Sequence, residues 1–162
     1  MLASIRKNDN GGFLVQYDRP LPHAAAKVWA ALTENHLLEK WMSNLQTVDL
    51  RQGGVIRFHM NDGTGAFENL EITDYEAFAV LAFTWGADRV RFEVSDKPEG
   101  SLLVLQEFVG TLTEHTPKDL AGWHVCLDML SALLDGQAID FPMDQWKVWY
   151  EKYIELVHHS KE

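Results

Sequence analysis

The stretch that decides the fold class is PKDLAGWHVCLDMLSALLDG, residues 117–136. Proline is favoured in the first turn of a helix and glycine just beyond its end, so the sequence predicts a helix from Pro117 to Asp135 that Gly136 terminates. With about 100° between successive residues, apolar side chains cover one broad face and much of the opposite side. The broad face carries Trp123, Cys126, Leu127, Leu130, Leu133 and Leu134, and the opposite side carries Ala121, Val125, Met129 and Ala132. We therefore expect other parts of the chain to enclose this helix.

The segments upstream of this helix have the composition and alternation of β-strands. In Val55–Met60 the apolar residues alternate with Arg57 and His59, which is the period of a strand with one buried face. The Gly53-Gly54 pair before it is a turn sequence, so neighbouring strands are expected to pair as antiparallel hairpins. The predicted strands are Phe13–Arg19, Val48–Leu50, Val55–Met60, Phe67–Tyr75, Phe78–Trp85, Arg89–Val94 and Leu102–Val109. They predict an antiparallel meander of about six strands.

Three further helices complete the predicted fold. His23–Thr33 is rich in alanine, and Asn35 can cap a short second helix that ends at Met42. Asp144–Val157 is amphipathic, with Trp146, Trp149, Tyr150, Tyr153 and Leu156 on the face expected to point inward. Because the chain contains no linker or repeat, residues 1–162 are interpreted as one α+β domain with its core at about 13–157.

Composition excludes several classes of function. The chain has 24 acidic and 14 basic residues and a net charge of −10, so its field repels nucleic acid, and we expect no nucleic-acid partner. The first residues contain no apolar run of the kind found in a signal peptide, and nothing approaches the roughly 18 apolar residues of a membrane span. The one cysteine, Cys126, forms no internal disulfide. These features predict a cytoplasmic protein without a membrane span.

Several motifs give the chain a family resemblance. They are Leu38-Glu39-Lys40-Trp41-Met42, Phe83-Thr84-Trp85, the pattern Gly122-Trp123-His124-x-x-Leu127-Asp128-x-Leu130-x-x-x-Leu134-x-Gly136, and Trp146 with Trp149-Tyr150-Glu151-x-Tyr153. Over roughly residues 14–157 the chain resembles the activator of heat-shock-protein-90 ATPase homologue-like family, bacterial single-domain type, of the START-like (SRPBCC) superfamily. The resemblance implies a helix-grip fold, in which a curved antiparallel sheet wraps the long helix near the end of the chain.

The resemblance also implies a hollow between sheet and long helix that holds an apolar small molecule, such as a lipid or polyketide-like compound. The predicted lining residues are Trp41, Phe58, Phe67, Trp85, Phe92, Leu105, Glu107, Trp123 and Leu127. Pockets of this kind are mostly apolar, with a few placed polar groups. The alternative is that these aromatic side chains simply pack a solid core, which is their commoner use.

Glu107 is the candidate polar anchor of this hollow. If its side chain is buried near Trp85 or Trp123, desolvation raises its pKa, and it can then donate a hydrogen bond to a ligand carbonyl or act as an acid. A glutamate that faces solvent at the edge of the sheet is the alternative. Arg57 and His59 share one strand face and form either a polar patch at the mouth of the cavity or a solvated surface.

An enzymatic function, of a cyclase or hydrolase type, is a weaker hypothesis. His124, Asp128 and Ser131 lie on one strip of the long helix, but an axial rise of about 10 Å separates the first from the last, which is too far for a nucleophile and its base. The histidines are scattered, and no cysteine or histidine cluster has metal-ligand spacing, so we predict no metal and no cofactor.

A cochaperone-like interaction is the remaining alternative. In eukaryotic cochaperones of the family an additional N-terminal domain contacts the chaperone, and this chain is expected to have no room for one. A large exposed patch formed by Trp146, Trp149 and Tyr150 would favour a protein-interaction function, whereas burial of these side chains would weaken it.

Overall fold

The computed structural model describes residues 1–161, which form eight strands and four helices. The strands are β1 (Ser4–Lys7), β2 (Phe13–Leu21), β3 (Leu45–Asp49), β4 (Val55–His59), β5 (Phe67–Glu76), β6 (Val80–Trp85), β7 (Asp88–Lys97) and β8 (Gly100–Val109). The helices are α1 (Ala25–Thr33), α2 (Asn35–Trp41), α3 (Thr116–Leu134) and α4 (Met143–Ser160). The α+β class predicted from the sequence is confirmed.

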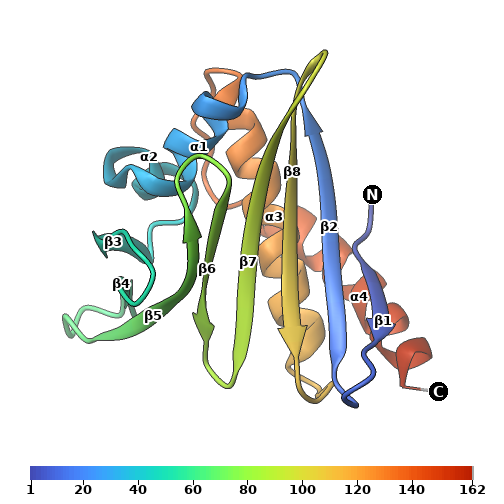
Figure 1. The fold of residues 1–162 in the computed structure, drawn as a ribbon. Helices are drawn as coiled ribbons and strands as arrows, with labels where there is room; N and C mark the ends of the chain where they lie inside the picture. The colour runs from blue at the N-terminus through green and yellow to red at the C-terminus, as the bar shows by residue number, and fades with distance from the viewer. Residues whose placement is uncertain (162) are drawn as a thin grey trace.

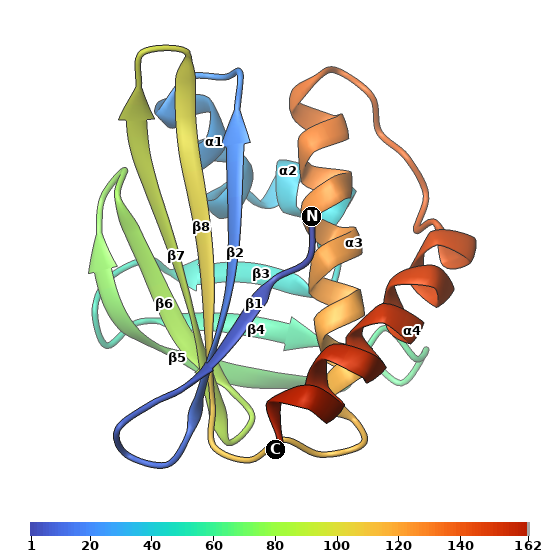
Figure 2. The same cartoon turned by 90° about the vertical axis from the view of Figure 1, so that its right-hand side faces the viewer.

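All eight strands belong to one antiparallel sheet with the order β1-β2-β8-β7-β6-β5-β4-β3. Consecutive hairpins account for every pairing from β3 to β8, and β2 closes the arrangement by pairing with β8, from Phe13 opposite Val109 to Leu21 opposite Ser101. The helices α1 and α2 lie between β2 and β3 in the chain and stand at one end of the sheet (Figure 1). The sheet curves strongly, so that β3 and β4 run across towards α3 (Figure 2).

The long helix α3 packs on the concave side of this sheet, which is the helix-grip arrangement (Figure 2). Pro117 lies in the first turn of α3, and Gly136 follows its end with φ of +88°, a conformation that glycine adopts without strain. Both predicted signals therefore mark the real ends of the helix. Leu120 and Val125 are fully buried, and Leu130 is 1% exposed, because the sheet and neighbouring helices enclose α3 on more than one side.

The sheet has eight strands against about six predicted, and the seven predicted segments correspond to β2 to β8. The prediction missed β1, whose four residues are mostly exposed and carry no alternating pattern. This strand exists because it pairs with the edge of β2, from Ser4 opposite Gln16 to Lys7 opposite Phe13. Pairing of this kind depends on an edge that another part of the chain has already formed, so a local pattern does not reveal it.

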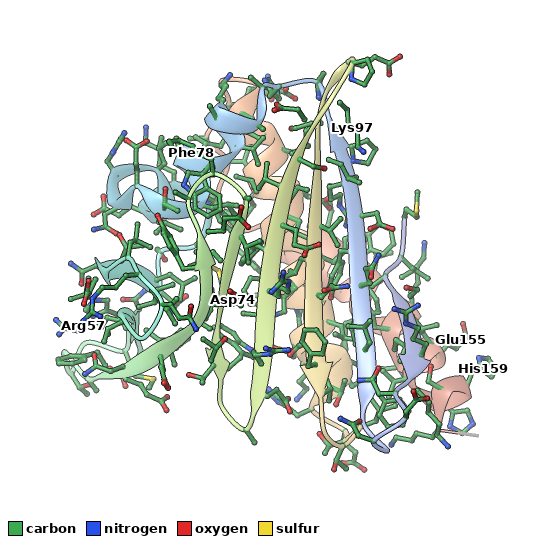
Figure 3. The ribbon with its side chains drawn as sticks, viewed as in Figure 1. Arg57, Asp74, Phe78, Lys97, Glu155 and His159 are labelled. Atoms are coloured by element: carbon green, nitrogen blue, oxygen red, sulfur yellow. The ribbon has the colours of Figure 1, made fainter. Side chains whose placement is uncertain are left out.

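The last helix, α4, covers the polar strip of α3. Tyr153 is buried and Trp149 is half-buried, as expected for the inward face of α4. His124, which belongs to the polar strip, is only 1% exposed because Trp149 lies over its ring at a centroid distance of 3.8 Å. Glu155 and His159 point away from the sheet on the outer side of α4 (Figure 3). Among residues 1–161, no helix is long and apolar enough to cross a membrane.

Candidate ligand-binding site

A cleft of about 480 Å³ opens at the end of the sheet where α3 begins. Three segments distant in the sequence form it: the β6–β7 turn, the end of β8 with the loop that follows, and the first turn of α3. All three lie at the lower end of the molecule in Figures 1 and 2. The side chains used in the argument below are Trp85, Asp88, Glu107, Val109, Thr116 and Asp119.

Glu107 occupies a position that the strand otherwise gives to apolar side chains. Alternate residues of β8 are buried, and Leu103, Leu105 and Val109 fill the neighbouring inward positions. Glu107 is 1% exposed, and its Oε1 atom has no hydrogen-bond partner among residues 1–161. Buried polar atoms are nearly always hydrogen-bonded in native structures. One oxygen of this carboxyl group, Oε1, therefore lacks a partner at the cleft.

Burial is the main cause that raises the pKa of Glu107 well above its ordinary value, because it disfavours the charged form. The negative charge of Asp119, and a hydrogen bond between the two carboxyl groups, raise the pKa further. Asp88 contributes in the same direction. The Glu107 side chain is buried and lines the same cleft as Trp85, and its protonated form is favoured.

Asp119 links this carboxyl group to the aromatic wall. It lies in the first turns of α3, and its Oδ1 accepts a hydrogen bond of 3.1 Å from Trp85 Nε1. The indole of Trp85 also packs at 4.9 Å from the Trp123 ring and at 5.4 Å from the Phe58 ring, between centroids. Trp85 is therefore fixed at the cleft with part of its surface exposed.

The arrangement can bind the polar end of an otherwise apolar molecule. A neutral carboxyl group donates a hydrogen bond to a carbonyl oxygen or accepts one from a hydroxyl group. The indole of Trp85 offers a flat apolar surface beside it. In the part of the chain that the structure describes, no group of three or more His, Cys, Asp or Glu side chains is arranged to hold a metal ion.

The structure distributes the nine predicted lining residues over four environments, and the fourth, an exposed surface, holds only Phe67. Trp85 and Glu107 line the cleft described above, and Phe58 and Trp123 line, with Trp85, a smaller cleft beside it. The residues Trp41, Phe92, Leu105 and Leu127 are at most 2% exposed and pack within the hydrophobic core. The ring of Phe92, for example, contacts the rings of both Trp41 and Trp123, at centroid distances of 6.5 and 5.9 Å. Side chains therefore fill the space between the middle of α3 and the sheet.

The prediction for Phe67 is wrong. Its side chain is 49% exposed, and the guanidinium of Arg57 lies 4.1 Å from its ring centroid. Arg57 stands at the outer edge of the sheet (Figure 3). His59 on the same strand has its Nε2 2.8 Å from Gln46 Oε1. Arg57, His59 and Phe67 share the partly solvated face of the sheet, opposite to the face on which Phe58 meets residues of α3.

In the strip formed by His124, Asp128 and Ser131, it is His124 that contacts α4. The hydroxyl of Tyr153 lies 2.7 Å from His124 Nδ1 and accepts a hydrogen bond of 3.0 Å from the backbone N–H of Ala3. Burial first, and then the positive charge of Arg19, lower the pKa of His124 to about 3. His124 is therefore neutral, and its Nε2 lies 3.8 Å from Asp128 Oδ2. The histidine has a structural role between α3, α4 and the N-terminal segment.

Sequence reasoning missed Asp119 and Thr116, which complete the cleft. Asp119 lies in the same helix as Trp123, but its importance comes from its contacts with Trp85 and Glu107 on two strands. Only the spacing of four residues between Asp119 and Trp123, which places both on one side of α3, could have indicated it.

Comparison with known proteins places this geometry in a family. The profile of the family described as "Activator of Hsp90 ATPase homolog 1-like protein" matches residues 22–135. A structure of a conserved protein of unknown function from Enterococcus faecalis, EF2215, is 27% identical, with a TM-score of 0.77 over 95% of this chain and 91% of that chain. No curated protein sequence matches.

Two further solved structures share the fold. CalU16 from Micromonospora echinospora is 21% identical, with a TM-score of 0.70 over 96% of each chain. DynU16, described as a protein in the dynemicin biosynthetic locus, is 22% identical, with a TM-score of 0.66 over 77% of this chain and 48% of that one. Because the family profile covers more than half of the sequence, the chain belongs to the Activator of Hsp90 ATPase homolog 1-like family of the START-like superfamily.

Proposed function

We propose that this protein binds an apolar or aromatic small molecule, lipid- or polyketide-like, that carries a hydroxyl or carbonyl oxygen. The observation that carries the proposal is the buried Oε1 atom of Glu107, which lies on a wall of the cleft and has no hydrogen-bond partner within residues 1–161. The ligand's oxygen is the missing partner, and its hydrocarbon part packs on Trp85 and Val109.

The free-energy balance at Glu107 supports a ligand. Leaving a buried polar group without a partner costs about 1–3 kcal/mol, whereas a leucine at an inward position of β8 would pack without that cost. A ligand hydroxyl or carbonyl that pairs with the carboxyl group removes the penalty on binding. The same hydrogen bond gives specificity, because an analogue without the oxygen leaves Glu107 unpaired again.

The charges around the cleft favour a neutral ligand. Asp88 and Asp119 line it together with Glu107, and the whole chain carries a net charge of −10. A carboxylate or sulfate on the ligand would meet this negative potential at close range. A phenol, a ketone or an alcohol meets no such repulsion. DynU16, a structural relative, is described as a protein of a biosynthetic locus, which accords with a small organic ligand.

The position of the site differs from the predicted one. The sequence predicts a ligand between the sheet and the helix Pro117–Asp135, and three of the predicted lining residues, Phe92, Leu105 and Leu127, pack as core. The proposed site lies instead at the end of the sheet, around Trp85 and Glu107. Binding there requires no rearrangement of the core.

Three naphthalenes test the proposal. We expect 2-naphthol and 2-acetonaphthone to shift the indole N–H resonance of Trp85 in a saturable manner in ¹H–¹⁵N spectra, and 2-methylnaphthalene to bind more weakly. In Glu107→Leu, the two oxygenated probes should bind no better than the hydrocarbon. Glu76→Leu, at an exposed position of β5, is the control and should bind like the wild type. Equal affinities for all three probes in the wild type, or unchanged affinities in Glu107→Leu, would overturn the proposal.

A further inference from the structure

A second cleft of about 180 Å³ lies next to the first and shares two residues with it. Trp85 and Asp119 line both clefts. The second cleft is completed by Met42, Asn44, Phe58, Gly122, Trp123 and Cys126. Along α3, the lining residues of the two clefts follow one another at intervals of three or four positions, so the clefts lie consecutively on one face of that helix.

Trp123 brings a second unsatisfied polar atom to this face. Its side chain is 2% exposed, and its Nε1 atom, which carries a hydrogen-bond donor, has no acceptor in the described part of the chain. An indole N–H that is buried usually finds a partner. Glu107 Oε1 in the first cleft and Trp123 Nε1 beside the second are thus two buried polar atoms without partners in the described residues, and Trp85 lines both clefts.

Gly122 has no structural explanation within the helix. Glycine is among the least favourable residues in the interior of a helix. Gly122 is the seventh residue of α3, which begins at Thr116. A Cβ atom at Gly122 would meet no other atom within 4 Å, so no close approach demands a glycine there. The missing side chain instead leaves open space in the second cleft.

We propose that the two clefts form one extended binding groove, and that the natural ligand is an elongated aromatic molecule with oxygen functions at both ends. One ligand oxygen forms a hydrogen bond with Glu107, and the other accepts a hydrogen bond from the indole N–H of Trp123. The rings between them pack on Trp85, the shared wall, and over Gly122. This inference rests on the proposed function and extends it from a single polar anchor to two.

Probes of different reach test the second anchor. The short probe is 2-naphthol, the long probe with one oxygen is 4-phenylphenol, and the long probe with an oxygen at each end is 4-acetyl-4′-hydroxybiphenyl. We expect the last to bind roughly three- to tenfold more tightly than 4-phenylphenol, which is the range for one added hydrogen bond. It should also move the Trp123 indole N–H resonance downfield, which 4-phenylphenol should not do.

Two variants separate the second cleft from the first. Gly122→Leu places a side chain in the open space and should weaken both long probes at least about tenfold while 2-naphthol binds as before. Trp123→Phe keeps an aromatic ring but removes the donor, and should abolish the preference for the acetyl group. Ala26→Leu, at an exposed position of α1, is the matched control.

The outcomes distinguish this inference from the proposed function. If 2-naphthol binds in a Glu107-dependent manner but Gly122→Leu leaves the long probes unaffected, the extended groove is refuted and the first site stands. If Trp123→Phe, with a cooperative melt like that of the wild type, retains the preference for the acetyl group, the second anchor is refuted. If no probe shows Glu107-dependent binding, both proposals fail together.

Discussion

Replacing Glu107 by glutamine should stabilise the protein by an amount that grows with pH. Burial and the neighbouring Asp119 raise the pKa of Glu107 well above its ordinary value of 4.5, so the folded protein keeps this proton at pH values where the unfolded chain has lost it. Above pH 4.5 the unfolded wild type therefore binds fewer protons than the folded one, and its free energy of unfolding falls as pH rises. For one proton the slope is at most about 1.4 kcal/mol per pH unit, up to the folded-state pKa. Glutamine has no proton to lose, so the variant lacks this decline.

Urea unfolding of both proteins, followed by tryptophan fluorescence and circular dichroism from pH 4 to pH 8, measures the effect. The difference between the two free energies of unfolding cancels the titrating groups that do not interact with Glu107, and it should widen by up to about 3 kcal/mol over the first two pH units in which Glu107 stays protonated. Glu76→Gln, at an exposed position, should give a flat difference. If the curves of wild type and Glu107→Gln run parallel, the carboxyl group ionises normally in the folded protein, and the account of the cleft is refuted.

Three stability predictions follow from the core and the turns. Leu130→Asp should abolish the cooperative melt in circular dichroism, because it places an unpaired carboxylate at a position that is 1% exposed. Tyr153→Phe should lower the free energy of unfolding by about 1–3 kcal/mol in a urea titration, since it removes the hydroxyl that lies 2.7 Å from His124 Nδ1, and an unchanged midpoint would contradict this role. Gly54→Ala should lower the free energy of unfolding by roughly 1–3 kcal/mol, because a Cβ atom there overlaps a backbone oxygen at the end of β3. Gly110→Ala, where a Cβ atom meets no other atom, should melt like the wild type.

The elements with a strong local pattern could be predicted from the sequence. The helix predicted from Pro117 to Asp135 and the observed α3, Thr116–Leu134, differ by one residue at each end. A proline, a glycine and a two-sided apolar pattern marked it independently of each other. The hairpins also appeared where turn residues separate alternating segments. Short edge strands such as β1 carry no comparable signal, since their pairing is decided by the partner strand.

The candidate site could be predicted only in part, because side-chain packing is not a property of any one segment. Glu107 was identifiable, since the alternation of β8 points it inward among leucines. Whether Phe92 lines a cavity or fills it depends on Trp41 and Trp123, which approach it from α2 and α3. The prediction for Phe67 is wrong because the face it occupies depends on its pairing with β4. Phe67 lies opposite His59, so it shares the exposed face of that residue and not the face of Phe58.

The unsatisfied buried atoms and the unexplained helix glycine of this protein gather around two neighbouring clefts, and this clustering is an argument for function. Of the three buried side-chain atoms found without partners in residues 1–161, Glu107 Oε1 and Trp123 Nε1 belong to residues that line neighbouring clefts, and Thr73 Oγ1 lies on β5. Gly122, a glycine without a steric reason in a long helix, lines one of the same clefts. Each of these features costs stability, and each has an ordinary replacement: leucine, phenylalanine or alanine. Violations of packing rules are expected at functional sites, where a ligand supplies what the fold lacks. Residues that merely completed a core would have no reason to gather their unsatisfied groups around one tryptophan.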